Sequence, residues 1–273
     1  MRKTLKPVFS ILLIAFIILT AVSCNDKPKE STIDNILKAG KIRIGLTPDY
    51  MPFEILDKSG AIMGFDIDIA ILLAEAMGVS PEFIQVTTGY DTLIPKLKNG
   101  EFDIILSGMT ATQKRNLEIC FSEPYIITGQ TLLVNNKHKG KINSYTDLNS
   151  AIFKVLYEKG TSGKAAIERL FPKCRYIAVD SADNGVKKLK KGEADAFIYD
   201  QPYCANVMAR EGKNAFIFLD QPITFEPLAI GMRQDNLALL NWVNNFIRQI
   251  QADGKYDELY TRWFLKNNWM KRL

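Results

Sequence analysis

The stretch LKNGEFDIILS at residues 97–107 returns as LKKGEADAFIYD at residues 189–200. Each copy reads as the end of a helix, a glycine stop, a tight turn and a buried apolar strand that ends in polar residues. Open α/β sheets bind ligands just beyond the carboxyl ends of their strands, so Ser107 and Asp200 are candidates for comparable binding positions. The repeat predicts two similar α/β lobes with facing strand ends.

The rest of the chain alternates short apolar runs with segments of helical periodicity, a pattern typical of an α/β fold. We expect strands at 41–46, 83–86, 103–106, 131–134, 153–157, 195–199, 216–219 and 228–232, and helices at 66–77, 90–98, 162–170, 181–191, 202–211, 236–252 and 255–264. About 250 residues follow Cys24, which is more than one core usually holds and suits two lobes.

The N-terminus has the pattern of an export signal. An apolar run at residues 8–22 follows a basic start and is short for a comfortable membrane-spanning helix, so we expect a signal peptide at 1–23. Arg2, Lys3 and Lys6 supply three of the formal net charge of +5. The remaining chain has little bias toward polyanions and no basic run mixed with aromatics, which argues against nucleic acid as a partner.

Cys24 directly follows small residues, an arrangement that resembles a bacterial lipobox, although Ala21 stands where a leucine is usual. Residues 24–32 are polar and have too little apolar surface to fold. We therefore expect a tether lipidated at Cys24, which would hold the exported protein on a bacterial membrane in the periplasm or at the cell surface. An ordinary signal peptide with an incidental cysteine is the alternative.

The other cysteines, Cys120, Cys174 and Cys204, are odd in number and lack metal-binding spacing. Cys120 and Cys204 lie in apolar stretches and are predicted to be small core residues. A disulfide between Cys174 and Cys204 is an option in an oxidising compartment, but the spacing does not establish it.

The segment after the first repeat suits an anion. Ser107, Gly108, Met109 and Thr110 place backbone N–H groups and hydroxyls just before a helical turn. Arg115 adds a planar guanidinium that can bind a carboxylate with two charge-assisted hydrogen bonds.

The second half of the chain offers a matching set. Thr161 and Ser162 precede an expected helix, and Asp200 supplies a negative charge at a strand end. Taken singly, Arg115 could be a surface charge and Asp200 a helix N-cap before Pro202. Together, an anion clamp on one lobe and an acid on the other predict a site for an α-amino acid.

Aromatic residues complete the predicted pocket. Tyr50 and Phe53 follow the first strand, and Tyr90 opens the helix before the clamp. Flat side chains at these positions can pack on a ligand's carbon chain or cationic group. Ordinary core packing is the better interpretation for Phe53.

Four motifs, PDYMPFE at 48–54, GFDIDI at 64–69, FSEPY at 121–125 and DGKY at 253–256, lie in a stretch from about 33 to 265. Together they resemble the bacterial extracellular solute-binding proteins of family 3, the polar amino-acid receptors of ABC importers. The resemblance implies a type II periplasmic-binding-protein fold, two α/β lobes joined by two hinge strands with a ligand cleft between. It places lobe 1 at 33–124 plus 229–273, hinges at 125–129 and 224–228, and lobe 2 at 130–223.

By the same resemblance, Arg115 would bind the α-carboxylate with Thr110 and Ser162, Asp200 would bind the α-ammonium, and Tyr50 and Tyr90 would stack on the side chain. The predicted binding set is Tyr50, Tyr90, Ser107, Gly108, Met109, Thr110, Arg115, Thr161, Ser162 and Asp200, with Thr47, Glu158 and Tyr199 as further candidates. Asp66 and Asp68 could suggest a metal pair, but we expect them to cap the first helix. No metal, cofactor or catalytic residue is predicted.

Two positions bear on specificity. Thr47 is neutral where many relatives carry an acid that contacts the ligand's side chain. Glu158 is acidic at a position that lies near the side-chain pocket in some relatives, which favours arginine, lysine or a similar polar amino acid. The alternative is that Glu158 points to solvent.

The sequence therefore predicts a monomeric, non-enzymatic protein that captures a free polar amino acid and delivers it to the permease of an ABC transporter, whose ATPase supplies the energy. One alternative is a cyclohexadienyl dehydratase-like enzyme on the same scaffold. Such an enzyme needs a positioned general acid, and Tyr203 stands where a glutamate is expected. The other alternative is a ligand-sensing receptor domain, which would need a separate signalling partner.

Overall fold

The computed structural model describes residues 31–266 and 268–273. The expected signal peptide, Cys24 and nearly all of the expected tether lie outside the described residues, so these predictions stay untested. Within the described residues, no helix combines the length and apolar character needed to cross a bilayer.

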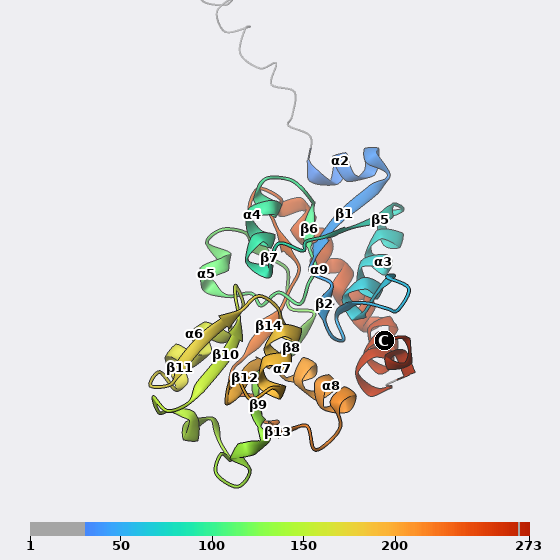
Figure 1. Cartoon of the computed structure of the whole chain (residues 1–273). Helices are drawn as coiled ribbons and strands as arrows, with labels where there is room; N and C mark the ends of the chain where they lie inside the picture. Colours follow the sequence, from blue (N-terminus) through green and yellow to red (C-terminus); the bar gives the residue numbers. More distant parts are fainter. Residues whose placement is uncertain (1–30, 267) are drawn as a thin grey trace, which may run out of the picture. The chain divides into compact units, whose positions relative to one another are not determined.

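Two five-stranded sheets organise the chain, one in each of two α/β lobes (Figure 1). The sheet of lobe 1 has the order β5 (Ser80–Gln85), β1 (Lys41–Leu46), β6 (Ile104–Ile105), β15 (Gly231–Met232) and β7 (Cys120–Phe121). The sheet of lobe 2 has the order β11 (Arg175–Val179), β10 (Lys154–Glu158), β12 (Ala196–Asp200), β9 (Gln130–Asn135) and β13 (Phe216–Leu219). A small sheet of β2 (Asp49–Tyr50), β3 (Glu54–Leu56) and β4 (Ile62–Met63) follows β1.

Helices connect and cover these strands. Those that precede the second sheet are α2 (Thr32–Ala39), α3 (Phe65–Met77), α4 (Leu93–Lys98) and α5 (Gln113–Asn116). Between strands of the second sheet lie α6 (Gly163–Leu170), α7 (Ala182–Lys190) and α8 (Gln201–Glu211), and after it come α9 (Leu237–Ala252) and α10 (Lys255–Tyr260). Short 3₁₀ or π turns span Tyr90–Thr92, Asn136–His138, Tyr145–Leu148, Thr261–Leu265 and Asn268–Arg272.

The internal repeat occupies the same place in both lobes. Its strands, β6 and β12, run parallel to β1 and β10, the first parallel strands of their sheets. The aspartate of each copy holds the neighbouring strand: Asp103 Oδ2 accepts from the backbone N–H of Arg43 at 2.9 Å, and Asp195 Oδ2 from that of Lys154 at 2.8 Å. Because each aspartate also ends the glycine turn, the motif fixes the start of one strand against the next. The predicted two-lobed α/β fold is confirmed.

The chain passes between the sheets twice. β8 (Ile126–Thr128) leads from β7 into β9, and β14 (Glu226–Leu228) leads from β13 back into β15. The two strands pair antiparallel, with Ile126 opposite Leu228. This pairing lies within the predicted hinge segments, whereas the hinge motion and the lobe boundaries stay predictions.

The core of lobe 2 shows whether Cys174 and Cys204 can form a disulfide. Along β12, Ala196 and Ile198 face one buried cluster, and Phe197 and Tyr199 face another. Cys174 belongs to the first cluster and Cys204 to the second, on opposite faces of the sheet. Cys174 and Cys204 therefore do not form the disulfide that the sequence left open, and all described cysteines are free. Cys204 is a buried core residue as predicted, whereas Cys120 is only half-buried.

The start of α3 also differs from the prediction. The cap position is Gly64, whose φ of 149° and missing Cβ let it pass the carbonyl oxygen of Phe53. Within the described chain, no side chain caps this helix. Asp68 instead accepts from Arg262 and from Trp263 Nε1, each at 2.7 Å, and Asp66 points into the protein interior. The expectation that both residues cap the helix is wrong.

Candidate ligand-binding site

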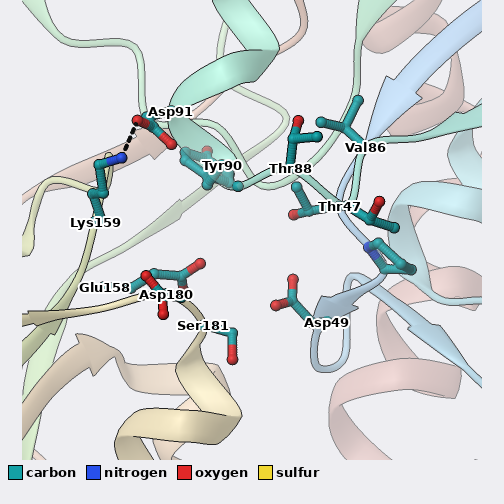
Figure 2. A pocket seen from close by; sticks show the side chains of 13 residues that line it. Thr47, Asp49, Val86, Thr88, Tyr90, Asp91, Glu158, Lys159, Asp180 and Ser181 are labelled. Atoms are coloured by element: carbon teal, nitrogen blue, oxygen red, sulfur yellow. Dashed lines mark ion pairs between the residues drawn. The ribbon is translucent and has the colours of Figure 1, made fainter.

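Two neighbouring cavities lie where strands of both sheets end at their carboxyl sides. The larger, which we call the acidic cavity, has a volume of about 400 Å³. Its lining follows the ends of β1, β5, β10 and β11 and comprises Thr47–Asp49, Val86–Asp91, Glu158, Lys159, Asp180 and Ser181. Figure 2 shows Glu158, Asp180 and Ser181 on one side of this space, opposite Thr47, Asp49 and Thr88.

The second cavity, which we call the narrow cavity, shares Tyr90 with the first and has a volume of about 10 Å³. It is lined by Tyr50, Tyr90, Gly108, Thr110, Arg115, Gln130, Thr161, Ser162, Tyr199 and Asp200. Eight of these ten residues belong to the predicted binding set, Tyr199 was a further candidate, and only Gln130 was not predicted. A space of this size holds no more than one water molecule. The described arrangement therefore leaves no room for an amino acid in the narrow cavity.

Arg115 forms the positive side of the narrow cavity. It lies on the short helix α5, where Thr112 Oγ1 caps the Arg115 backbone N–H at 3.2 Å. Its guanidinium donates to the carbonyl oxygens of Thr110 in lobe 1 and Gly160 in lobe 2, each at 2.8 Å, and lies 5.5 Å from the centre of the Tyr90 ring. The side chain thus lies over an aromatic face, and one of its two donor groups reaches the other lobe.

Asp200 forms the negative side. It occupies the N-cap position of α8, but its carboxylate makes no capping bond to the described helix. It accepts instead from Tyr50 Oη across the lobes and from Gln130 Nε2. Burial raises the pKa of Asp200 to about 7; the Tyr50 hydrogen bond opposes the shift, and the charge of Glu226 adds to it. An ammonium group at this position would stabilise the ionised form.

Gln130 was missed by the sequence analysis. It is the first residue of β9 and stands opposite Asp200 in the antiparallel register with β12. Its amide donates both to Asp200 and, at 3.1 Å, to Ser162 Oγ. A polar residue directly before the strand predicted at 131–134 was the available signal, but its partner depends on strand pairing that the sequence does not specify.

Aromatic rings close the narrow cavity. The Tyr50 and Tyr199 rings meet edge-on with centroids 5.4 Å apart. Gly108 has a φ of +52°, and a Cβ there would lie 2.1 Å from the Tyr50 ring, so only glycine lets this ring lie on the loop. Ser107 and Met109 lie outside the lining of both cavities: Ser107 Oγ donates to Glu54 at 2.7 Å, and Met109 packs in the core of lobe 1.

Charge dominates the acidic cavity. Its lining holds four carboxyl groups, Asp49, Asp91, Glu158 and Asp180, and one lysine, Lys159. Lys159 pairs with Asp91 at 3.0 Å, the dashed contact in Figure 2. Among the described residues, no ion pair neutralises the other three carboxyl groups.

Glu158 is the most enclosed of these groups. It is only 3 % exposed and lines the cavity, so the alternative that it points to solvent is wrong. Burial raises the pKa of Glu158 to about 8, and the charges of Asp49 and Asp200 add to the shift. Asp49 and Asp180 were not among the predicted site residues, although Asp180 directly follows β11 and Asp49 begins β2 shortly after the end of β1.

The described residues contain no cluster of three or more His, Cys, Asp or Glu side chains suited to a metal ion. The site offers instead a cationic clamp, an opposing acid, aromatic walls and a negatively charged extension. This arrangement, at the facing strand ends of two similar lobes, defines a two-lobed solute-binding protein of the type II periplasmic-binding-protein fold.

The chain belongs to the bacterial extracellular solute-binding proteins, family 3, whose model matches residues 42–266. It is 33 % identical over 273 residues to the ABC transporter glutamine-binding protein GlnH of Bacillus subtilis, covering 95 % of this chain and 97 % of that protein.

Two solved structures are also similar. A binding component of an ABC transporter from Wolinella succinogenes, in complex with lysine, has a TM-score of 0.81 and 41 % identity, with 85 % of this chain and 99 % of that one covered. The ancestral amino-acid-binding protein AncCDT-1, a precursor of cyclohexadienyl dehydratase, has a TM-score of 0.80 and 40 % identity, with 86 % and 100 % covered.

Proposed function

We propose that the protein captures an α-amino acid with a cationic side chain and presents it to the permease of an ABC transporter. The observation that carries this proposal is the buried Glu158 in a cavity whose acids outnumber its single lysine, directly beside the Arg115–Asp200 pair.

The narrow cavity supports the α-amino and α-carboxyl part of the proposal. Arg115 would bind the α-carboxylate and Asp200 the α-ammonium, with Thr110, Thr161 and Ser162 as further polar contacts. In the described structure, the Arg115 guanidinium donates to the Gly160 carbonyl, and the Asp200 carboxylate accepts from the Tyr50 hydroxyl. The ligand would exchange these weaker neutral partners for charged ones, which would favour closure around it.

The acidic cavity supports the cationic side chain. Burial of ionised Glu158 beside other acids costs free energy unless a positive charge contacts it, and the one lysine of the cavity pairs with Asp91 instead. A lysine or arginine side chain that extended from the narrow cavity past Tyr90 would supply that charge. The lysine complex of the Wolinella protein agrees with this choice, and AncCDT-1 is described as a cationic amino acid solute-binding protein. The glutamine-binding relative makes glutamine the main competitor.

Isothermal titration calorimetry with lysine, arginine, ornithine, glutamine and glutamate tests the proposal. We expect micromolar or tighter dissociation constants for the cationic amino acids, weaker binding of glutamine, and no binding of glutamate. Tighter binding of glutamine than of every cationic amino acid would overturn the side-chain assignment. Absence of binding across the panel would overturn the function.

Glu158→Gln should lower the affinity for lysine by about 10- to 30-fold, since it removes a charge-assisted contact of about 1.5–2 kcal/mol. Affinity for glutamine should change little. Calorimetry on both ligands measures this change in selectivity. Glu168→Gln, which removes the same charge from the exposed face of α6, is the matched control. Equal losses for lysine and glutamine in Glu158→Gln would contradict the proposed contact.

The Glu158→Gln variant also tests the pH dependence of lysine affinity. A cationic ligand favours ionised Glu158, whose pKa of about 8 leaves it largely protonated at pH 6. Lysine affinity should therefore rise between pH 6 and pH 8. The rise should be smaller in Glu158→Gln, where only Asp200 contributes in the same direction.

We infer that the protein is not a dehydratase. Tyr203, at the position where a glutamate would be expected, is buried, and its hydroxyl donates to Asp183 at 3.0 Å. It lies outside the lining of both cavities, where it has no access to a substrate. Incubation of the purified protein with prephenate or arogenate should give no product. Turnover of either compound would show that the protein is a dehydratase.

Export, the lipid anchor at Cys24, delivery to a permease and the monomeric state complete the proposal. Membership of an extracellular family supports export, and the ABC transporter named for GlnH supports delivery. The anchor and the monomeric state rest on the sequence alone.

A further inference from the structure

Two fully buried carboxyl groups lie behind the binding loops and outside the lining of both cavities. Glu54, on β3, and Asp66, on α3, are each 0 % exposed. Buried acids of this kind are costly unless they are paired or hydrogen-bonded. The proposed amino-acid site gives neither residue a role through direct contact with the ligand.

Both carboxyl groups hold the loop that follows β6. Asp66 Oδ2 accepts from the Gly108 backbone N–H at 2.7 Å and from Tyr125 Oη at 2.9 Å. Glu54 Oε1 accepts from Ser107 Oγ at 2.7 Å. Short buried hydrogen bonds of this kind fix the backbone at the floor of the narrow cavity.

Ser107 connects these hydrogen bonds to the acidic cavity. Its Oγ accepts from the Thr47 backbone N–H at 3.1 Å, so Glu54, Ser107 and Thr47 form a chain of hydrogen bonds. Thr47 follows β1 and lines the acidic cavity. The two carboxyl groups thereby connect with both binding loops of lobe 1.

Each carboxyl group retains one unsatisfied oxygen. Glu54 Oε2 and Asp66 Oδ1 are buried and receive no hydrogen bond from any described group. Among the described residues, the titratable groups that act on the pair are Asp49 and the hydroxyls of Tyr50, Tyr90, Tyr125 and Tyr256, and none of them is a cation. The Glu54 and Asp66 side chains are in hydrogen-bonding contact with each other. Two ionised carboxylates here would repel each other without compensation, whereas one proton between them would form a hydrogen bond.

We propose that Glu54 and Asp66 share one proton, carried by Glu54, and that this acid–carboxylate pair positions Ser107, Gly108 and Thr47 for ligand binding. Asp66 is then the ionised acceptor of the Gly108 N–H, and Glu54 donates to Asp66 while it accepts from Ser107. The direction of the pKa shifts agrees: burial raises both, and the mutual contact raises the pKa of Glu54 further while it opposes the rise at Asp66. Both are positioning residues, and their effect on binding rests on the proposed function.

Glu54→Gln separates this arrangement from an ionised pair. Its amide N–H₂ can donate permanently to Asp66, and its amide oxygen can still accept from Ser107. We expect the variant to fold and to bind lysine within about threefold of the wild type. Glu54→Ala removes both contacts and should lose tenfold or more in lysine affinity. Equal losses in both variants would overturn the shared proton.

The pH dependence of stability gives a readout that needs no ligand. In the folded state Glu54 keeps its proton above the ordinary value of about 4.3, at which the unfolded chain releases it. Stability from this group is therefore present below that pH and lost as the pH rises toward the folded pKa. Burial raises the pKa of Asp66 to about 6, so the pair holds a single proton above that pH. Relative to Glu54→Gln, the unfolding constant of the wild type should rise about tenfold per pH unit between pH 6 and pH 8.

Urea unfolding of the wild type, Glu54→Gln and Glu75→Gln over this range measures the effect. Glu75 lies on the exposed side of α3, so its variant should follow the wild-type profile. Parallel profiles for wild type and Glu54→Gln would overturn the proposal, even if amino acids bind. A tenfold divergence without any amino-acid binding would support the shared proton and reject the proposed function instead.

Discussion

Arg115→Ala should reduce the affinity for the amino-acid ligand by about 100- to 1,000-fold, or roughly 3–4 kcal/mol. The guanidinium is the only basic group among the residues that line the narrow cavity, so the ligand's carboxylate would lose its charged partner and stay enclosed. The variant also loses the contact to the Gly160 carbonyl, which joins the lobes in the closed arrangement. Calorimetry with lysine measures the loss, and circular dichroism checks the fold.

Two further variants sharpen this test. Arg115→Lys keeps the charge but not the planar pair of donors, so it should recover only part of the affinity. Lys114→Ala removes a positive charge from the exposed side of the same helical turn and should bind like the wild type. If Lys114→Ala weakened binding as much as Arg115→Ala, the effect would come from general electrostatic attraction and not from a specific clamp.

The parts of the site that follow local rules could be predicted from the sequence. Arg115 was identified because a glycine-containing loop and a helical turn place it beside the end of a strand. Asp200 was identified because the internal repeat marks its strand end as the counterpart of Ser107. Both residues line the narrow cavity, because the repeat has the same topology in both lobes.

The parts that depend on contacts between distant segments could not be predicted. Gln130 reaches Asp200 through antiparallel pairing of β9 with β12, seventy positions along the chain. Asp180 enters the acidic cavity only because β11 lies beside β10 in the sheet. Acids are favoured in the first turn of a helix, which predicts a cap at Asp66, but its observed partners, Gly108 and Tyr125, come from other segments.

Asp200→Asn should weaken ligand binding by about 30- to 300-fold and at the same time stabilise the ligand-free protein. The amide keeps the shape of the side chain and can still accept from Tyr50, but it offers no charge to the ligand's ammonium group. In the free protein, the burial that raises the Asp200 pKa to about 7 disfavours the carboxylate. Stability from the protonated form is present below the unfolded pKa near 3.9 and is lost as the pH rises through 7.

Opposite changes in binding and stability distinguish a functional charge from a structural one. Urea unfolding without ligand should show the gain of Asp200→Asn at pH 8 and little difference at pH 4, and calorimetry at pH 8 should show the loss of affinity. Asp220→Asn, an exposed acid just after β13, should change neither. A variant that lost stability at pH 8 would place Asp200 among the residues that hold lobe 2 together. The Asp200 carboxylate is buried, makes no capping bond to its helix within the described chain, and accepts from a hydroxyl of the other lobe. These observations favour a role of Asp200 in ligand binding over a role in the stability of lobe 2.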